Sequence, residues 1–264
     1  MYGQHTALIR SCHTIWLLGY AEQAKANIAK AIFNSRQTND SHDLCWTLDF
    51  SSYLDFMLRD YEKMGNRRQE VNSLLHKYDF PFYRASSHFM RGWEYANKGL
   101  AGDAWSAFNQ GKEAREKLGA RIFQPLWNCL IIESLQQTMQ YKKALNITNK
   151  AIQDTKRTGE EFLTAELYRL KGMLNFQLYG TIADSEAHYN VAIGIARQQN
   201  ARSLELRATT SLCRLLQEQG RIETARQTLS EIYKWFSEGF DTADLVEAKA
   251  LLDELEQVGS ILES

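Results

Sequence analysis

A cysteine and two histidines near the N-terminus are the residues that best fit a metal site or a nucleophilic centre. Cys12 and His13 are adjacent, and His5 precedes them. Neighbouring residues on a helix point about 100° apart, so this pair cannot ligate one tetrahedral ion, and no second Cys/His pair supplies further ligands. The four cysteines are widely spaced, without a CxxC pair. We therefore expect reduced, packed thiols and no bound metal.

Acid–base catalysis would need a pair of carboxyl groups or a catalytic motif, and phosphate binding would need a glycine-rich loop. Carboxylate pairs such as Glu160-Glu161 fall at expected turns or on outward helix faces, where a solvated charge is the usual role. The chain lacks GxSxG and HExxH motifs. The nearest match to a GxxxxGK[ST] phosphate loop is Gly111-Lys112, which is followed by Glu113. We therefore expect a protein that is not an enzyme and that binds no cofactor.

Charge and hydropathy exclude two further classes of function. The chain has 31 Lys and Arg against 32 Asp and Glu, a formal charge of −1. Small basic spots such as Arg67-Arg68 and Lys142-Lys143 are scattered and balanced by acidic residues, which does not indicate a nucleic-acid surface. No run of 18 apolar residues and no signal-peptide pattern is present. We expect no nucleic-acid or membrane partner, and a cytoplasmic location.

Pro occurs twice and Gly 15 times in 264 residues, and both counts are below average usage. Such a composition suits a chain made almost wholly of helix, so helices must position these side chains. Six helix-turn-helix units align on a residue, mostly small, early in each second helix, with a spacing of 40 residues and once 41. Five positions earlier lies a tight turn, which is glycine in four units. The aligned residues are Ala24, Met64, Ala104, Ala144, Ser185 and Ala225, and the turns are at Gly19, Arg59, Gly99, Met139, Gly180 and Gly220.

The sequence therefore predicts an all-α fold: a right-handed superhelical solenoid of about six hairpins with a C-terminal capping helix, forming a single domain over residues 1–264. The capping helix is expected to begin at Asp241 or Thr242 and to bury one apolar face. The expected repeats cover about residues 3–40, 41–80, 81–120, 121–159, 160–199 and 200–239, and the cap covers 241–257.

The pattern of small residues and turn glycines resembles the tetratricopeptide repeat (TPR) class, with a longer unit. It is most similar to the TPR-like superhelical C-terminal domain of bacterial class III nucleotide cyclase and signal-transducing ATPase regulators. The stretches that carry this resemblance are WLLGYAEQA (16–24), AELYRLKG (165–172), IARQQNARSLELRA (195–208), GRIETARQTLSEIY (220–233), WFSEGFDTADL (235–245) and EAKALLDELE (247–256). The cyclase and ATPase modules are missing from this chain, so the resemblance implies only a binding or regulatory role, as an excised domain or as a free-standing protein.

Aromatic side chains are the remaining candidates for recognition. The first helix of each TPR-like hairpin lines the concave side, and counting back from the aligned residues places aromatic side chains there in the first three units. Large aromatic side chains rimmed by polar groups give peptide-binding grooves their affinity. The candidate groove residues are His13, Trp16, Trp46, Asp49, Tyr53, Phe56, Phe89, Trp93 and Glu133.

The function that follows is a protein- or peptide-binding regulatory module of bacterial signalling that uses this concave face. Two alternatives stay open. One is a sensor for a small apolar or aromatic effector, held in one pocket between Trp46, Tyr53 and Trp93. The other is a structural module, a scaffold that holds two partners at a fixed distance or dimerises through its N-terminal edge. Equally open is a core role for the aromatic residues, because long repeats need large side chains to fill the space between helices. A recognition surface requires that Trp46, Tyr53, Phe89 and Trp93 be partly exposed.

Overall fold

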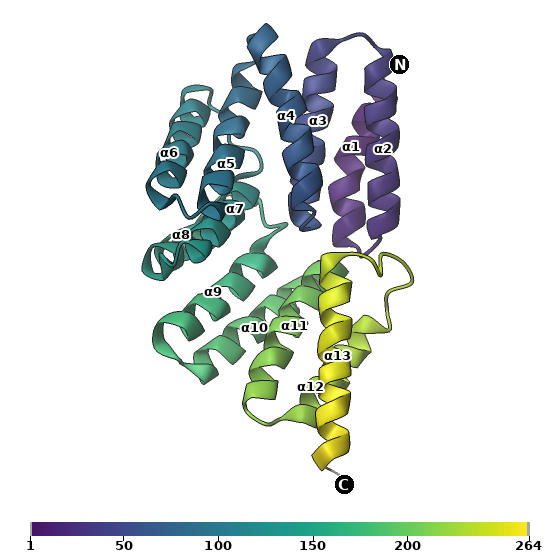
Figure 1. Cartoon of the computed structure of the whole chain (residues 1–264), viewed down its shortest axis with the longest axis vertical. Coiled ribbons are helices and arrows are strands. Elements are labelled where there is room, and N and C mark those ends of the chain that lie inside the picture. The colour runs from purple at the N-terminus through teal and green to yellow at the C-terminus, as the bar shows by residue number, and fades with distance from the viewer. Residues whose placement is uncertain (1, 263–264) are drawn as a thin grey trace. The chain divides into compact units, whose positions relative to one another are not determined.

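The computed structural model describes the backbone of residues 2–262 and the side chains of residues 7–258. This part of the chain contains thirteen α-helices and no strand (Figure 1), as the sequence predicts. Contacts between helices group the chain into two compact units. Unit 1 holds Gln23–Ile147 together with the first helix up to Thr14, and unit 2 holds Ile15–Glu22 together with the chain from Thr148 onward. The prediction that all repeats form one domain stays a prediction.

Unit 1 is built from most of the first eight helices. The end of the first helix, the start of the second and the part of the eighth from Thr148 onward belong to unit 2. Consecutive helices pack as hairpins, α3 with α4 and α5 with α6, and α5 also packs against α7. Pro81 begins α5 and Pro125 is the second residue of α7, where a missing N–H costs no helical hydrogen bond. The helices are α1 (Tyr2–Leu17), α2 (Ala21–Gln37), α3 (Ser41–Met57), α4 (Tyr61–Lys77), α5 (Pro81–Asn97), α6 (Ala101–Lys117), α7 (Gln124–Gln137) and α8 (Tyr141–Thr158).

Unit 2 repeats this arrangement with five further helices. α9 packs with α10 and α11 with α12, and α13 covers α11 and α12. α13 begins directly after Thr242 and buries its predicted apolar face, which includes Leu245, Leu251 and Leu255. The helices are α9 (Thr164–Tyr179), α10 (Ile182–Gln198), α11 (Arg202–Glu218), α12 (Ile222–Tyr233) and α13 (Ala243–Leu262).

The six hairpin turns lie where the 40-residue period predicts them. Each turn residue has a positive φ, from 58° to 101°. Four are glycines, which adopt this left-handed conformation without steric cost. Arg59 and Met139 adopt it with φ of 60° and 58°, although a side chain there costs roughly 1–2 kcal/mol. The geometry of the repeat therefore dictates the turn even where the residue type does not favour it.

The aligned residues of the second helices are all buried at helix crossings, as predicted. In unit 2, the backbone carbonyl of Ala225 on α12 accepts a hydrogen bond from the Cys213 thiol of α11 at 3.2 Å. No room for a larger side chain remains at this crossing, because Ala225 is fully buried against its neighbours.

Replacing Ala225 by leucine is expected to lower the free energy of unfolding by about 1–3 kcal/mol, because the added methyl groups overpack the crossing of α11 and α12. Urea denaturation measures the loss. The matched control is Ala183→Leu on the exposed side of α10, which should leave stability almost unchanged. Equal stability of both variants would contradict the alignment of the repeats.

Candidate functional site

The inner helices of unit 1 meet in a packed group of rings, which we call the inner aromatic cluster: Phe50 and Tyr53 of α3, Phe89 of α5, Trp127 of α7, and Phe123 just before α7. The ring of Trp127 stacks on Phe89 at 4.8 Å between centroids and meets Tyr53 edge-on at 4.9 Å. Phe123 meets Phe50 edge-on at 5.4 Å. These rings pack against one another, so the side chains of α3 and α7 are in direct contact.

Two glycine residues allow the inner aromatic cluster to pack closely against α6. A Cβ atom at Gly111 would lie 2.8 Å from the ring of Phe89, and one at Gly92 would lie 2.4 Å from the ring of Phe108. Both distances are shorter than any real carbon contact. These two glycines thus allow α5 and α6 to approach closely enough to bury Phe89 and Phe108 fully.

Asp49 of α3 is a buried carboxyl group at the edge of the inner aromatic cluster. The hydroxyl group of Tyr53 donates a hydrogen bond to Asp49 Oδ2, and Tyr53 Oη also lies 3.1 Å from Ser86 Oγ of α5. Burial raises the pKa of Asp49 to about 7, although these hydrogen bonds and the positive charge of Arg115 favour the ionised form. Asp49 therefore changes its charge close to neutral pH.

Arg115 of α6 is a cation whose positive charge acts on the Asp49 carboxyl group. Its guanidinium group lies 5.5 Å from the ring centre of Phe82 and 5.6 Å from that of Trp127. It also donates a hydrogen bond to the backbone carbonyl of Ile122. A buried arginine stacked on aromatic rings is well placed to compensate a carboxylate in an apolar surrounding.

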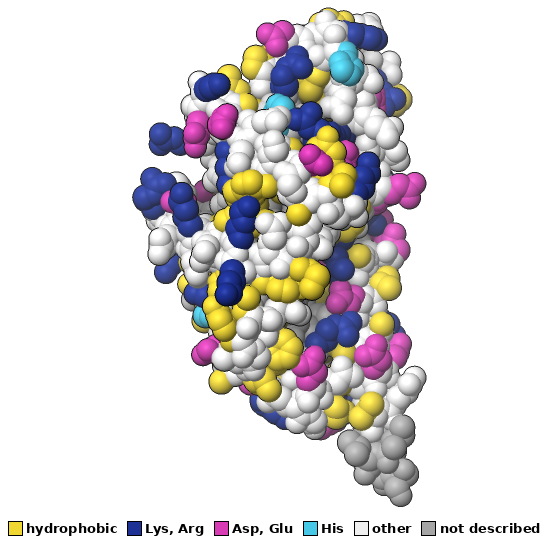
Figure 2. Space-filling view, turned by 60° about the vertical axis from the view of Figure 1, so that its left-hand side comes forward, with side chains coloured by type: hydrophobic (Ala, Val, Ile, Leu, Met, Phe, Trp, Pro, Cys, Tyr) yellow, Lys and Arg dark blue, Asp and Glu magenta, His cyan; other side chains and the backbone are white. Residues whose placement is uncertain are grey.

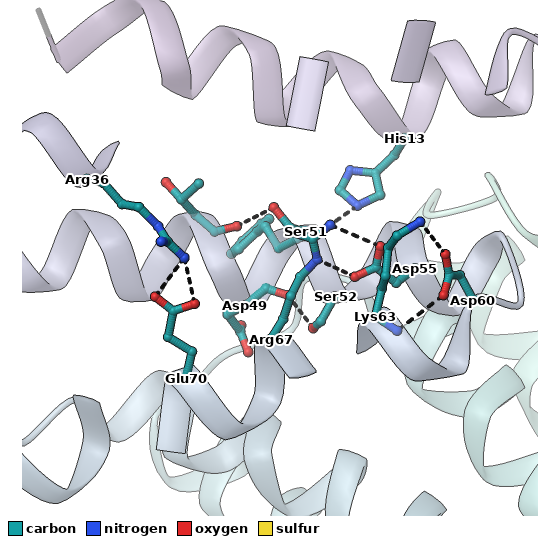
Figure 3. Close-up of polar contacts among 12 residues, drawn as sticks. His13, Arg36, Asp49, Ser51, Ser52, Asp55, Asp60, Lys63, Arg67 and Glu70 are labelled. Carbon is teal, nitrogen blue, oxygen red and sulfur yellow. Dashed lines mark hydrogen bonds and ion pairs between the residues drawn. The ribbon is translucent and has the colours of Figure 1, made fainter. Parts of the chain in front are cut away.

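His13 of α1 is buried on the other side of the same cluster. Its Nε2–H donates a hydrogen bond to the backbone carbonyl of Phe50 at 3.2 Å (Figure 3). The His13 ring also lies 5.7 Å from that of Phe123. Burial lowers the pKa of His13 to about 4, so the imidazole is neutral at pH 7. Its Nδ1 lies 3.6 Å from Cys12 Sγ, and burial raises the pKa of that thiol to about 12. Cys12 is thus an unreactive packed thiol.

Ion pairs fix α4 on the helices that carry these residues (Figure 3). The guanidinium group of Arg67 on α4 donates to the carboxylate of Asp55 on α3, and burial raises the pKa of Asp55 to about 6 despite this partner. The Arg36 guanidinium of α2 donates to both carboxylate oxygens of Glu70 on α4, at 2.9 and 3.0 Å. These contacts hold the hairpins of unit 1 in register.

The predicted groove is largely closed. His13, Asp49, Tyr53, Phe56, Phe89 and Trp93 are buried, so the expectation of partly exposed rings is wrong for Tyr53, Phe89 and Trp93. The physical reason is that neighbouring helices touch through their rings: Tyr53 and Phe89 both pack on Trp127 of α7, and Trp93 packs on Tyr61 of α4 at 4.7 Å between centroids. Trp46 and Glu133 are half-buried, as a recognition surface requires.

Trp16 belongs to unit 2 and is buried there. The guanidinium group of Arg207 on α11 lies 5.0 Å from the centre of the Trp16 ring, and the Ser203 hydroxyl group donates to the Trp16 carbonyl at 2.6 Å. Arg207 also forms two hydrogen bonds of 2.9 Å with the carboxylate of Asp244 on α13. Its neighbour Glu166 pairs with Arg169 on α9. Trp16 therefore packs on an ion network that ties the inner helices of unit 2 together.

Two aromatic residues that the groove prediction missed are exposed in unit 2. Trp235 and Phe240 lie in the irregular segment between α12 and α13, and 38% and 49% of their surfaces are exposed. Trp235 is nevertheless fixed: its ring contacts Tyr20 at 5.7 Å, and the Arg202 guanidinium lies 5.3 Å from its centre. A Cβ atom at Gly19 would lie 2.5 Å from this ring. Phe240 follows in the same segment, and its ring lies 6.0 Å from that of Tyr233. We call the half-buried Tyr20 together with the exposed Trp235 and Phe240 the exposed aromatic surface.

A sequence signal for this surface does exist. Trp235 and Phe240 stand in the stretch WFSEGFDT, which breaks the 3.6-residue apolar periodicity while keeping large rings. Phe236 of the same stretch is buried in the core of unit 2. An aromatic residue outside a helical stripe has no predicted core position, and such residues are candidates for recognition.

The described side chains give no sign of a metal site: no group of three or more His, Cys, Asp and Glu residues among them could hold an ion. The side chain of His5 lies outside that set. Cys12, Cys45, Cys129 and Cys213 are buried, and none of these four described residues forms a disulfide. None of the described helices is long and apolar enough to span a lipid bilayer.

Comparison with known sequences gives a distant match. No protein-family model matches the chain. An uncharacterised protein of Rhizobium meliloti (strain 1021) is 22% identical over 199 residues, which are 75% of this chain and 19% of that protein. The chain thus spans about a fifth of the length of the curated relative it matches.

Comparison with solved structures is more informative. A Rap protein complexed with competence and sporulation factor is similar with a TM-score of 0.69 and 14% identity, over 98% of this chain and 77% of that one. The apo form of RapI is similar with a TM-score of 0.59 and 14% identity, over 97% and 72% of the two chains. Together with the thirteen helices and their hairpin period, this likeness shows that the chain has the all-α fold of TPR-like helical-repeat proteins.

Proposed function

We propose that this chain is a non-catalytic regulatory module that binds a protein or peptide partner through the exposed aromatic surface. The observation that carries the proposal is that Trp235 and Phe240 are exposed while Trp235 is fixed by Tyr20, Arg202 and the close approach of Gly19. An exposed ring that is already immobilised loses little conformational entropy on binding. Tryptophan, tyrosine and arginine are also the residues that most often dominate binding energy at protein interfaces.

The inner face has a smaller part in this proposal than the sequence predicts. Trp46 and Glu133 keep partly exposed side chains and stay candidates for contact with a partner. Trp46 lies against Phe50, with their ring centroids 5.1 Å apart, at the margin of the inner aromatic cluster. A small-molecule effector would have to displace the packed rings of that cluster, and this supports the protein or peptide partner over the alternative.

The cellular setting is also part of the proposal. We place the chain in bacterial signalling, in the cytoplasm, as a sensor or docking domain of a larger regulator of the cyclase and ATPase class. The matched relative from Rhizobium meliloti is about five times as long as the matched region, which is 19% of it, and this supports a domain of a larger protein. The shared fold of Rap protein in complex with competence and sporulation factor supports a regulator that binds a peptide. The cyclase and ATPase class rests on the sequence resemblance alone.

Panning a phage-displayed library of random 12-residue peptides against the immobilised chain tests the proposal. Peptides enriched on the wild-type chain should bind the double variant Trp235→Ala, Phe240→Ala at least about thirtyfold more weakly, which corresponds to the 2 kcal/mol of a typical hot spot. Far-ultraviolet circular dichroism checks that the variant keeps its helices.

The matched control is Phe33→Ala, which removes an exposed aromatic ring from α2. It should bind the selected peptides as the wild type does. Peptides that bind all three proteins equally, or a library that yields no enrichment, would remove the exposed aromatic surface from the proposal. A loss confined to Trp46→Ala would move the binding site to the inner face.

A further inference from the structure

Basic side chains outnumber their acidic partners where α4, α5 and α6 meet in unit 1. Arg68 extends from α4, His88 and Arg91 from α5, and Arg84 stands at the rim, near the start of α5. Figure 2 shows dark blue Lys and Arg side chains beside cyan histidine in the upper part of one face. The acidic contribution to this group comes from Glu94, whose Oε1 lies 3.3 Å from Arg68 Nη1, and from the well-exposed Asp79 beside Arg84.

Arg91 has only neutral partners among the described residues. Its Nη2 donates to His88 Nδ1 at 2.7 Å and to Gln110 Oε1 of α6 at 2.8 Å. Because Nδ1 of His88 accepts this bond, the neutral imidazole carries its proton on Nε2. Nε of Arg91 is buried and finds no hydrogen-bond acceptor within the described residues. The Arg91 guanidinium is thus oriented by neutral groups while its charge stays uncompensated.

Arg68 is the deepest residue of the group. Only 8% of its surface is exposed, and Nη1 is buried without a hydrogen bond to any described residue, although it is paired with Glu94. Burial lowers the pKa of Arg68, the negative charge of Glu94 raises it, and the positive charge of Arg91 lowers it again, so the two guanidinium groups are near enough to repel each other. Burial and the charges of Arg91, Arg68 and Arg84 likewise lower the pKa of His88. Buried cations in proteins are ordinarily paired, and these lack a full complement of anions.

We propose that Arg68, His88 and Arg91 form a binding site for an oxyanion, a carboxylate or a phosphate group, where α4, α5 and α6 meet. Arg91 Nε has no acceptor among the described residues, and Arg68 Nη1 has an ion-pair partner in Glu94 but no hydrogen bond to a described residue. Both N–H groups supply charge-assisted hydrogen bonds of the kind that guanidinium groups form with oxyanions. His88 adds Nε2–H. A bound anion also relieves the mutual repulsion of the arginines. This site is separate from the exposed aromatic surface and does not depend on the proposed function.

Titration of the whole chain with inorganic phosphate, at constant ionic strength maintained with chloride, tests the proposal by nuclear magnetic resonance of the arginine Nε–Hε groups. We expect one arginine signal, assigned to Arg91 by its absence in Arg91→Gln, to shift and saturate. The dissociation constant measured by calorimetry should rise at least tenfold in Arg91→Gln and in Arg68→Lys. Arg36→Gln, which removes an exposed arginine paired with Glu70, is the matched control and should bind phosphate as the wild type does.

A capped hexaglutamate peptide and a capped hexaglutamine peptide distinguish the source of the oxyanion. Displacement of phosphate by the glutamate peptide alone identifies carboxylates of an acidic partner, whereas saturable binding of phosphate without displacement identifies a phosphate-bearing ligand. Either result supports the site. Absence of saturable binding of both probes to the wild-type chain, or equal binding by Arg91→Gln, overturns it, and this outcome says nothing against the exposed aromatic surface.

Discussion

Replacing Trp127 by alanine is expected to lower the free energy of unfolding by about 3–5 kcal/mol. Trp127 is fully buried at the centre of the inner aromatic cluster, where it stacks on Phe89 and meets Tyr53 edge-on. Its removal leaves a cavity that the helices α3, α5 and α7 cannot close without shifting together. The loss therefore combines the transfer free energy of the ring with the cost of the cavity.

Trp46→Ala is the matched control for this substitution, because Trp46 is a half-buried tryptophan at the margin of the same cluster. We expect it to cost well under half as much, since most truncations of partly exposed side chains cost about 1 kcal/mol. Urea denaturation of both variants provides the comparison. Similar midpoints for Trp127→Ala and the wild type would show that the cluster is not the packed core described here, and would reopen the inner face as a groove.

A second large effect is expected from the charge of Asp49. Its pKa in the folded protein is about 7, against an ordinary value of 3.8, so between these values the folded state holds a proton that the unfolded chain has lost. Stability from this group is complete below pH 3.8 and is lost as the pH rises through 7. At roughly 1.4 kcal/mol per pH unit, the wild type should lose about 2–3 kcal/mol between pH 5 and pH 7.5 from Asp49 alone.

Asp49→Asn keeps the size of the side chain and an oxygen that accepts from Tyr53, but removes the titration. The difference in unfolding free energy between the variant and the wild type should therefore change in favour of the variant by this amount from pH 5 to pH 7.5. His13, whose depressed pKa of about 4 works in the opposite direction, and Asp55, at about 6, are present in both proteins and cancel in the difference. A difference that does not vary with pH would mean that Asp49 titrates normally.

The hairpins could be predicted from the sequence because their determinants are local. A turn that needs a left-handed backbone and a crossing that needs a small side chain each depend on a few neighbouring residues. Arg59 shows the strength of the period, since its residue type does not favour a positive φ, yet its place in the repeat predicts the turn that the structure has.

The exposure of the inner residues could not be predicted in this way. Whether Tyr53 faces a groove or a neighbouring ring depends on how closely α3 and α7 approach, and that distance is the sum of packing contacts along the intervening hairpins. A change of a few degrees per hairpin opens or closes such a face. Trp235 was missed for a different reason, because the segment between α12 and α13 has no periodicity from which to count.

Unit 2 is discontinuous in sequence, which affects how the chain is synthesised and folded. Trp16 finds its partner Ser203 across 187 residues. At ribosomal rates of about 5–20 residues per second, Trp16 waits about 10–40 s for this partner to emerge. During that time a large indole is without its native cover, and a chain shortened before α11 never supplies it. In a linear array each repeat is covered by the next repeat as soon as that one is synthesised. Here, residues of the last hairpins cover the end of the first helix and the turn after it.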